Sequence, residues 1–171
     1  MNLLRHLNPF REPDLIIRRK SGKAYLRRWW VIPRNKHFNI YLHHFLESDD
    51  PDALHDHPWN WASVILKGQY WEHTEHGLFL RRAFRPRFGE ATDMHRVELT
   101  TELVVKPTSQ PGEYETVLEE KPVWTIFITG PKKRDWGFKC PSGWRLWSDY
   151  VSRKERADGT GENGVGAGCG E

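Results

Sequence analysis

The stretch HDHPWNWASVILKG, from His55 to Gly68, carries the strongest structural signal in the sequence. A single residue separates His55 from His57. Side chains two positions apart on an extended segment point to the same side, so both imidazole rings are expected on one face. Neutral imidazole is the commonest metal ligand in proteins. The stretch therefore predicts an extended segment that presents two histidine ligands to one site.

A third histidine, His95, begins another predicted strand and shares a face with Val97 and Leu99. If that face is the interior of a barrel, the three imidazoles converge there. Three histidines leave open positions on a metal ion, which is typical of a reactive site and not of a closed structural one. The alternative is a polar cluster at the rim of the barrel.

Glu72 is a candidate fourth ligand, because a strand would place it on the same face as Tyr70 and Thr74. The alternative for this residue is a solvent-facing carboxylate on a hairpin, where acidic side chains are usually found.

The chain around these residues consists of short β-branched and aromatic runs separated by Gly, Pro and Asp, the pattern of an all-β sandwich or barrel. Within residues 38–42 the side chains alternate in character, so one face of this strand belongs to the core. One of His43 and His44 must face inward as a hydrogen-bonded core histidine. Strands are expected at residues 24–32, 38–46, 61–67, 69–73, 78–84, 95–99, 114–118, 123–129 and 145–151.

A length of 171 residues suits one domain. We expect residues 1–22 to form an N-terminal arm and residues 23–157 to form the β-barrel. Residues 158–171 are rich in Gly and lack aromatic side chains, so a disordered tail is expected there.

His55, His57 and Gly68 match the first motif of the cupin superfamily, in which His-x-His precedes a Glu and then a Gly. Trp61 or Ala62, depending on the spacing used, stands at the position of that Glu, and Pro86, Gly89 and a displaced His95 are what remains of the second motif. The chain thus resembles the cupins, which are double-stranded β-helix (jelly-roll) barrels with a metal ion in the lumen. The resemblance implies an all-β barrel and a divalent metal cofactor.

Residues 55–150 are more closely similar to uncharacterised cupin-like proteins of phages and bacteria. The shared features are the HDHPW block, the LKGQY stretch at residues 66–70 and a later segment at residues 130–144. Because cupins often dimerise through their sheets, the resemblance also implies a homodimer.

Composition argues against several classes of protein. Cys140 and Cys169 are far apart, and the second lies in the Gly-rich tail, so we expect no disulfide framework and a reducing, cytoplasmic compartment. No apolar run is long enough to cross a membrane. The net charge is only +3 and the arginines are scattered, so nucleic-acid binding is not expected. An accessory role on RNA or DNA, through Arg81, Arg82, Arg85, Arg87 and Arg96, is the weakest alternative.

Aromatic and basic residues near the histidines are candidates for lining a ligand cavity. Trp59 and Trp61 share strand parity with His55 and His57, and Trp136 follows the basic residues 132–134. Such a wall would suit a molecule with an apolar or ring-shaped body and an anionic group held by an arginine fork. The alternative for residues 132–135 is an ordinary solvated turn. The expected lining residues are Trp59, Trp61, Tyr70, Arg134 and Trp136.

These features predict a metal-dependent enzyme of the dioxygenase or isomerase type that acts on a small molecule. His55, His57 and His95 would bind Fe(II), Mn(II), Ni(II) or Zn(II), and binding would weaken below about pH 6.5, where free histidine is protonated. The alternative is a non-catalytic cupin module that binds a ligand or a partner protein, in a phage context, with metal-free histidines. The absence of the motif Glu favours this alternative.

Overall fold

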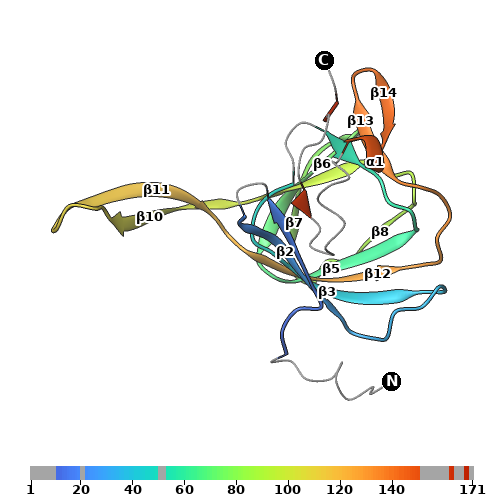
Figure 1. Cartoon of the computed structure of the whole chain (residues 1–171), viewed down its shortest axis with the longest axis horizontal. Coiled ribbons are helices and arrows are strands. Elements are labelled where there is room, and N and C mark those ends of the chain that lie inside the picture. Colours follow the sequence, from blue (N-terminus) through green and yellow to red (C-terminus); the bar gives the residue numbers. More distant parts are fainter. Residues whose placement is uncertain (1–10, 20–21, 50–52, 151–161, 164–167, 170–171) are drawn as a thin grey trace.

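The computed structural model describes residues 11–19, 22–49, 53–150, 162–163 and 168–169. Two β-sheets face one another and curl into a barrel, and a long two-stranded ribbon projects from one side (Figure 1). Among the described strands, every pair is antiparallel except β1 with β15. The expected all-β architecture is therefore present.

The larger sheet has the strand order β15-β1-β2-β3-β12-β5-β8. It contains β1 (Leu15–Arg19), β2 (Ala24–Trp30), β3 (Asn39–Phe45), β5 (Trp61–Lys67), β8 (Arg87–Gly89), β12 (Val123–Thr129) and β15 (Glu162–Asn163). The smaller sheet has the order β14-β13-β4-β9-β6-β7. It contains β4 (Leu54–His55), β6 (Gln69–Thr74), β7 (Gly77–Arg82), β9 (His95–Leu99), β13 (Gly137–Cys140) and β14 (Gly143–Leu146).

The register of the larger sheet shows which side chains face the barrel interior. Residues paired directly across antiparallel strands point to the same side of a sheet. His43 pairs with Thr125, which in turn pairs with Ile65, and all three are buried. Phe38 and Ile40 point to the opposite face of the sheet, and Phe38 is 50% exposed. The inner face of β3 is therefore the one that carries Asn39, Tyr41 and His43.

The core between the sheets is apolar beneath β6 and β9. Its buried members are Ile65, Tyr70, Val97, Leu99 and Val123. A second apolar cluster lies beside β13, where the ring centroids of Phe138 and the buried Tyr150 are 3.7 Å apart. Both clusters leave the middle of the barrel to polar and aromatic side chains.

The projecting ribbon pairs β10 (Thr101–Pro107) with β11 (Tyr114–Glu120). Its two ends meet where the amide of Lys121 donates to the carbonyl of Thr100, at 2.8 Å. Leu103, Val105, Tyr114 and Leu118 share one face of the ribbon and are 64–70% exposed. Of these two strands the sequence predicts only the one at residues 114–118, because it does not show that residues 101–107 pair with β11.

The expected strand at residues 145–151 is wrong in its second half. After β14 the chain forms the short helix α1 (Trp147–Tyr150). The Trp147 ring stacks on that of Trp136 at 5.6 Å, and its amide donates to the carbonyl of Trp136. These two tertiary contacts favour a turn over a further extended strand.

The expectation of unpaired cysteines is also wrong, because Cys140 and Cys169 form a disulfide. Gly168 is held beside Cys140 by hydrogen bonds from its amide to the carbonyl of Tyr150 and from Arg145 to its own carbonyl. The cysteine spacing could not reveal this long-range contact. Disulfides persist mainly in oxidising compartments, so the cysteines no longer support the reducing compartment inferred from sequence.

Four residues of the expected tail, 162–163 and 168–169, are described, and the rest of residues 158–171 lie outside the described residues. Of the expected N-terminal arm, residues 11–19 and 22 are described, and residues 11–19 contain β1. The division of the chain into these three segments therefore stays a prediction.

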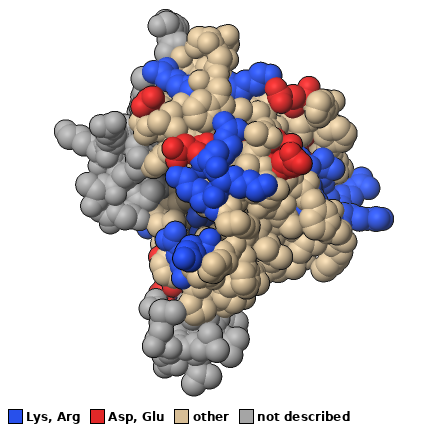
Figure 2. All heavy atoms as spheres, turned by 90° about the vertical axis from the view of Figure 1, so that its right-hand side faces the viewer, with Lys and Arg blue, Asp and Glu red and all other residues tan. Residues whose placement is uncertain are grey.

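The described surface carries mixed charge. Figure 2 shows Lys and Arg side chains in several separate groups, most of them with Asp or Glu beside them. Surface pairs such as Lys106 with Glu119 and Lys121 with Glu102 are consistent with this distribution. A search of the described helices finds none with the length and apolar character of a membrane span.

Candidate metal centre

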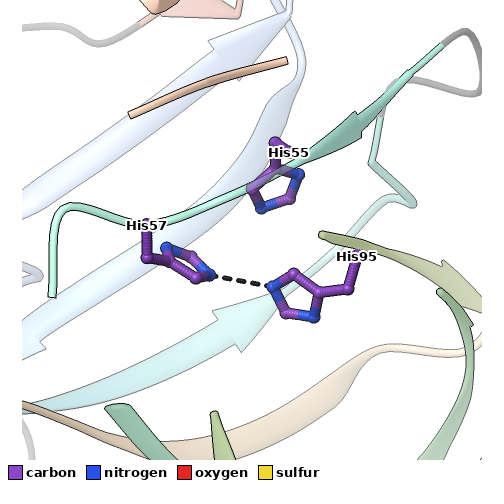
Figure 3. Close-up of side chains that lie close together, drawn as sticks. All are labelled: His55, His57 and His95. Atoms are coloured by element: carbon purple, nitrogen blue, oxygen red, sulfur yellow. Dashed lines mark hydrogen bonds between the residues drawn. The ribbon is translucent and has the colours of Figure 1, made fainter. Parts of the chain in front are cut away.

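The three predicted histidine ligands converge inside the barrel. His55 on β4 pairs directly with His95, the first residue of β9, and His57 follows on the extended segment after β4. The amide of His57 donates to the carbonyl of Ala91, which fixes this segment against the loop before β9. One ring nitrogen from each histidine lies within 4.8 Å of the other two. Figure 3 shows the three rings turned toward a common point.

The closest approach in this cluster is between His57 and His95. Their Nε2 atoms are 2.8 Å apart and share a hydrogen bond, drawn as the dashed line in Figure 3. Two nitrogen ligands bound at about 2.0–2.1 Å from one zinc ion lie only slightly farther apart than this. The donor set is therefore of the right type and spacing for a divalent transition-metal ion.

Glu72 supports the site from behind and differs from both sequence expectations. Its side chain is fully buried, so it is not a solvent-facing carboxylate. Its oxygens accept hydrogen bonds from His95 Nδ1 at 2.8 Å, Arg81 Nε at 2.7 Å and Arg87 Nε at 2.6 Å. It does not belong to the group of converging donor atoms. The structure thus places Glu72 as a hydrogen-bond partner of His95, outside the cluster of converging donor atoms.

The contact with Glu72 determines which nitrogen of His95 is free. A buried carboxylate accepts a hydrogen bond from Nδ1–H, so the lone pair of His95 is on Nε2, which faces the other two histidines. Burial raises the pKa of Glu72, but the hydrogen bonds and charges of His95 and Arg87 outweigh burial and lower that pKa to about 2. Glu72 is therefore ionised and can orient His95 at any physiological pH.

Asp49 is a second buried carboxylate near the site, and the sequence analysis missed it. It accepts hydrogen bonds from the amide of Val97, at 2.6 Å, and from the hydroxyl of Tyr25. One of its oxygens lies 3.9 Å from His55 Nδ1. The only sequence signal was an acidic residue in a turn-like segment, and such segments are common.

Asp56, between the two histidines, points away from them. Its buried carboxylate accepts from the amide of Gly137 at 2.6 Å and from Trp144 Nε1 at 3.0 Å, and it pairs with Arg134 at 2.9 Å. Burial raises its pKa, while these contacts act in the opposite direction. Asp56 therefore links the histidine segment to β13 and β14 and stabilises this loop.

Trp61 stands at the position of the first-motif glutamate under one of the two motif spacings, and Ala62 under the other. The Trp61 ring stacks on His95 with centroids 5.0 Å apart and packs edge-on against His57 at 5.6 Å. Its Nε1 is buried and has no hydrogen-bond partner among the described residues. An aromatic wall thus stands where the sequence pattern would otherwise place a carboxylate.

The other expected lining residues divide into two groups. Trp59 stacks on His57 at 6.4 Å and Trp136 lies 6.2 Å from His55, so both are near the histidines. Tyr70 packs in the apolar core instead, and burial raises its pKa. The guanidinium of Arg134 pairs with the buried Asp56 and lies over the ring of Trp144, so part of its binding capacity is used within the chain.

Comparison with known proteins supports the fold. No protein-family model matches the sequence. No curated protein matches it either. Among solved structures, the DMSP lyase DddQ of Ruegeria pomeroyi DSS-3 superposes with a TM-score of 0.50 at 11% identity, over 72% of this chain and 56% of the lyase. The chain has the cupin double-stranded β-helix fold.

Other cupin structures superpose less well. A cupin superfamily protein of Desulfitobacterium hafniense DCB-2 gives a TM-score of 0.44 at 11% identity, over 77% of this chain and 90% of that one. A protein of Klebsiella pneumoniae with a double-stranded β-helix domain gives a TM-score of 0.45 at 14% identity, over 77% of this chain and 96% of that one. The strand topology and the superposition with DddQ confirm the expected jelly-roll class. The closer similarity to phage proteins with the HDHPW block stays a prediction.

The cupin barrel keeps two of its histidines neutral. Burial lowers the pKa of His55 to about 4, with a smaller lowering effect from His95 that Asp49 opposes. Burial also lowers the pKa of His57 well below its usual value, and His95 and His55 add to this effect. Only neutral imidazole can bind a metal ion. Competition by protons at His55 is therefore expected near pH 4, and not near the pH of 6.5 expected for a free histidine.

These pKa values predict an acid-sensitive metal-free protein. Between pH 6.5 and pH 4 the unfolded chain binds a proton at His55 that the folded chain does not bind, so stability rises with pH in this window. For His55 alone, lowering the pH from 7 to 5 should decrease the free energy of unfolding by about 2 kcal/mol. Urea unfolding at both pH values, on the wild type and on His55→Gln, measures this. An equal pH dependence in both proteins would contradict the assignment to His55.

Proposed function

We propose that the chain binds one divalent transition-metal ion through His55, His57 and His95 and acts as a metal-dependent enzyme on a small molecule. The observation that carries this proposal is the convergence of three ring nitrogens within 4.8 Å. Two further features support it: two of the rings are kept neutral by burial, and Glu72 orients the third. Three protein ligands leave coordination positions for substrate.

A metal ion held there would supply Lewis-acid or redox chemistry, as in isomerases or dioxygenases, with Fe, Mn, Ni and Zn as the candidate metals. The residues of the chain prepare the site for this. Glu72 keeps the proton of His95 on Nδ1. Trp61 and Phe127 stack at 5.6 Å and cover one side of the histidines with apolar surface. This arrangement limits the access of water from that side and strengthens polar contacts inside.

One observation favours a second candidate, a non-catalytic cupin that binds a ligand or a partner protein. Trp61 or Ala62, depending on the spacing, stands at the position of the motif glutamate, and Glu72 is engaged by His95 and two arginines, so the cluster of converging donors among the described residues contains no carboxylate. Homodimer formation, a phage context and a cytoplasmic location also remain proposals that rest on the resemblance and on composition.

Metal content after reconstitution tests the proposal. The wild type should retain about one ion per chain and the double variant His55→Ala, His57→Ala less than about 0.2, because two of three ligands are lost. The matched control is His73→Ala, His76→Ala, which removes two histidines of the β6–β7 hairpin outside the cluster. Content below about 0.2 in the wild type, or equal content in wild type and double variant, would contradict metal binding.

Cobalt substitution distinguishes the two candidates. An enzyme site with open positions should change its visible absorption when azide is added to the Co(II)-loaded protein, because azide binds the free positions. An unchanged spectrum would show that no position is open to substrate and would favour the non-catalytic module.

A further inference from the structure

A second polar group lies on the inner face of the barrel, apart from the three histidines. Arg28 on β2 pairs directly with His43 on β3, and His43 pairs directly with Thr125 on β12. Directly paired residues share a face, so these three side chains form a row across the larger sheet toward the lumen. Neither the metal centre nor the apolar core uses this row.

Arg28 is the charged member of the row. Its Nε donates to His43 Nε2 at 2.8 Å, and its guanidinium lies over the ring of Tyr41 at 5.0 Å. None of the described carboxylates forms an ion pair with it. Burial lowers its pKa, which indicates that its charge is poorly solvated. A guanidinium has five N–H donors, so both terminal nitrogens remain available for an acceptor.

The other two members of the row, His43 and Thr125, can form hydrogen bonds but carry no negative charge that would compensate Arg28. Burial and the nearby Arg28 lower the pKa of His43 well below its usual value, so His43 is neutral and its Nε2 accepts a hydrogen bond from Arg28 Nε–H. Thr125 is 2% exposed, and its hydroxyl has no partner among the described residues. A buried hydroxyl without a partner is unfavourable unless a ligand or water completes it.

The row lies close to the metal centre. The ring of Phe127 is 5.4 Å from that of His43 and also 5.4 Å from that of His57. One phenyl ring on the barrel wall therefore separates the two polar groups. A small molecule lying along this aromatic wall could contact both of them.

We propose that Arg28 binds the carboxylate of a small monoanionic substrate whose other end faces His55, His57 and His95, and that the hydroxyl of Thr125, on the same face of the sheet two strands away, is a further donor to the bound molecule. This inference rests on the proposed function and names the substrate class of the same site. A planar carboxylate matches the guanidinium fork in two parallel hydrogen bonds. One unpaired cation balances one negative charge, which favours a carboxylate over a phosphate group of nearly two charges.

Binding of benzoate to the metal-free protein tests the proposal independently of metal binding. Benzoate carries one carboxylate on a ring that suits the aromatic wall, and benzamide is the neutral molecule of the same shape. We expect benzoate to shift the NMR signal of the Arg28 Nε–H with a dissociation constant on the order of 1 mM, and benzamide to have no effect. Inorganic phosphate at equal ionic strength forms the third arm and should bind more weakly than benzoate.

Three variants assign the effect. Arg28→Gln removes the charge and should weaken benzoate binding about tenfold, as read from the indole signals of the tryptophans. Arg27→Gln is the matched control, because Arg27 is the exposed neighbour on the other face of β2, and it should bind like the wild type. Thr125→Val keeps the side-chain shape, removes the hydroxyl and should weaken binding about threefold.

Any one of four results would overturn the proposal. These are wild-type affinity for benzoate in Arg28→Gln, binding of benzamide as tight as that of benzoate, binding of phosphate tighter than that of benzoate, and no binding of benzoate to the wild type. If Arg28→Gln does not fold, the Thr125→Val variant and the comparison of benzoate with benzamide in the wild type still test the proposal. These measurements use metal-free protein, so they are independent of metal binding. If benzoate does not bind, the result of the metal-content measurement is unaffected, and if metal does not bind, the result of the benzoate measurement is unaffected.

Discussion

Glu72→Gln is expected to destabilise the metal-free protein by about 3 kcal/mol, because removing one partner of a buried charge cluster leaves the others uncompensated. Arg81 and Arg87 both donate to this carboxylate, which is completely buried. The side chains of the two arginines are partly exposed, so water can recover part of the loss. The change in free energy of unfolding is measured by urea denaturation at pH 7.

The same substitution should weaken metal binding about tenfold or more, since partners of metal-bound histidines contribute that much to affinity. The neutral amide introduced at this position can accept one hydrogen bond but does not hold the Nδ1 proton of His95 as a carboxylate does. Glu98→Gln is the matched control. Glu98 is half-exposed and pairs with His73 and Arg96 on the outer face of the same sheet, and its loss should cost less than about 1 kcal/mol. Equal effects of the two substitutions would refute the orienting role of Glu72.

Gly89→Ala is expected to disturb the metal centre from a distance. A Cβ atom at this position would lie 2.4 Å from two ring atoms of Trp61, far inside contact distance. The Trp61 ring is buried and stacked on His95, so it cannot move without displacing the histidine. We expect a loss of stability of about 1–3 kcal/mol, as is usual for overpacked cores, together with a change in metal affinity.

Gly130→Ala is the control for this substitution. Its Cβ would lie 3.5 Å from the carbonyl of Asn60, an ordinary contact, so its effect should stay within about 0.5 kcal/mol. Thermal unfolding and metal titration of both variants check the prediction. If Gly89→Ala retained wild-type stability and metal affinity, the close packing of Trp61 on β8 would not be needed to position His95.

The parts of the site that depend on local periodicity could be predicted from sequence. The i, i+2 spacing of His55 and His57 fixes their common direction once the segment is extended, and the same alternation places His95 with Val97. The class of fold followed from the short β-branched runs and the motif residues. In each case neighbours within a few positions contain the information.

Features that depend on which strands pair could not be predicted. Glu72, Arg81 and Arg87 meet only because β6 pairs with β7 and the larger sheet closes over them. The choice of His43 over His44 as the inner histidine depends on the pairing of β3 with β2 and β12. Asp49 and the Cys140–Cys169 disulfide likewise depend on contacts between distant segments. Strand register is a global property, which a single sequence constrains weakly.

The ribbon of β10 and β11 leaves the barrel and returns to the place where it left, since Thr100 and Lys121 are hydrogen-bonded to each other. Among the described strands, these two pair only with one another, and the chain continues into β12 as if the excursion had been a short turn. Changing the length of such an excursion alters loop-closure entropy only slowly. The barrel and its histidines can therefore keep one geometry while this segment lengthens, shortens or changes sequence during evolution.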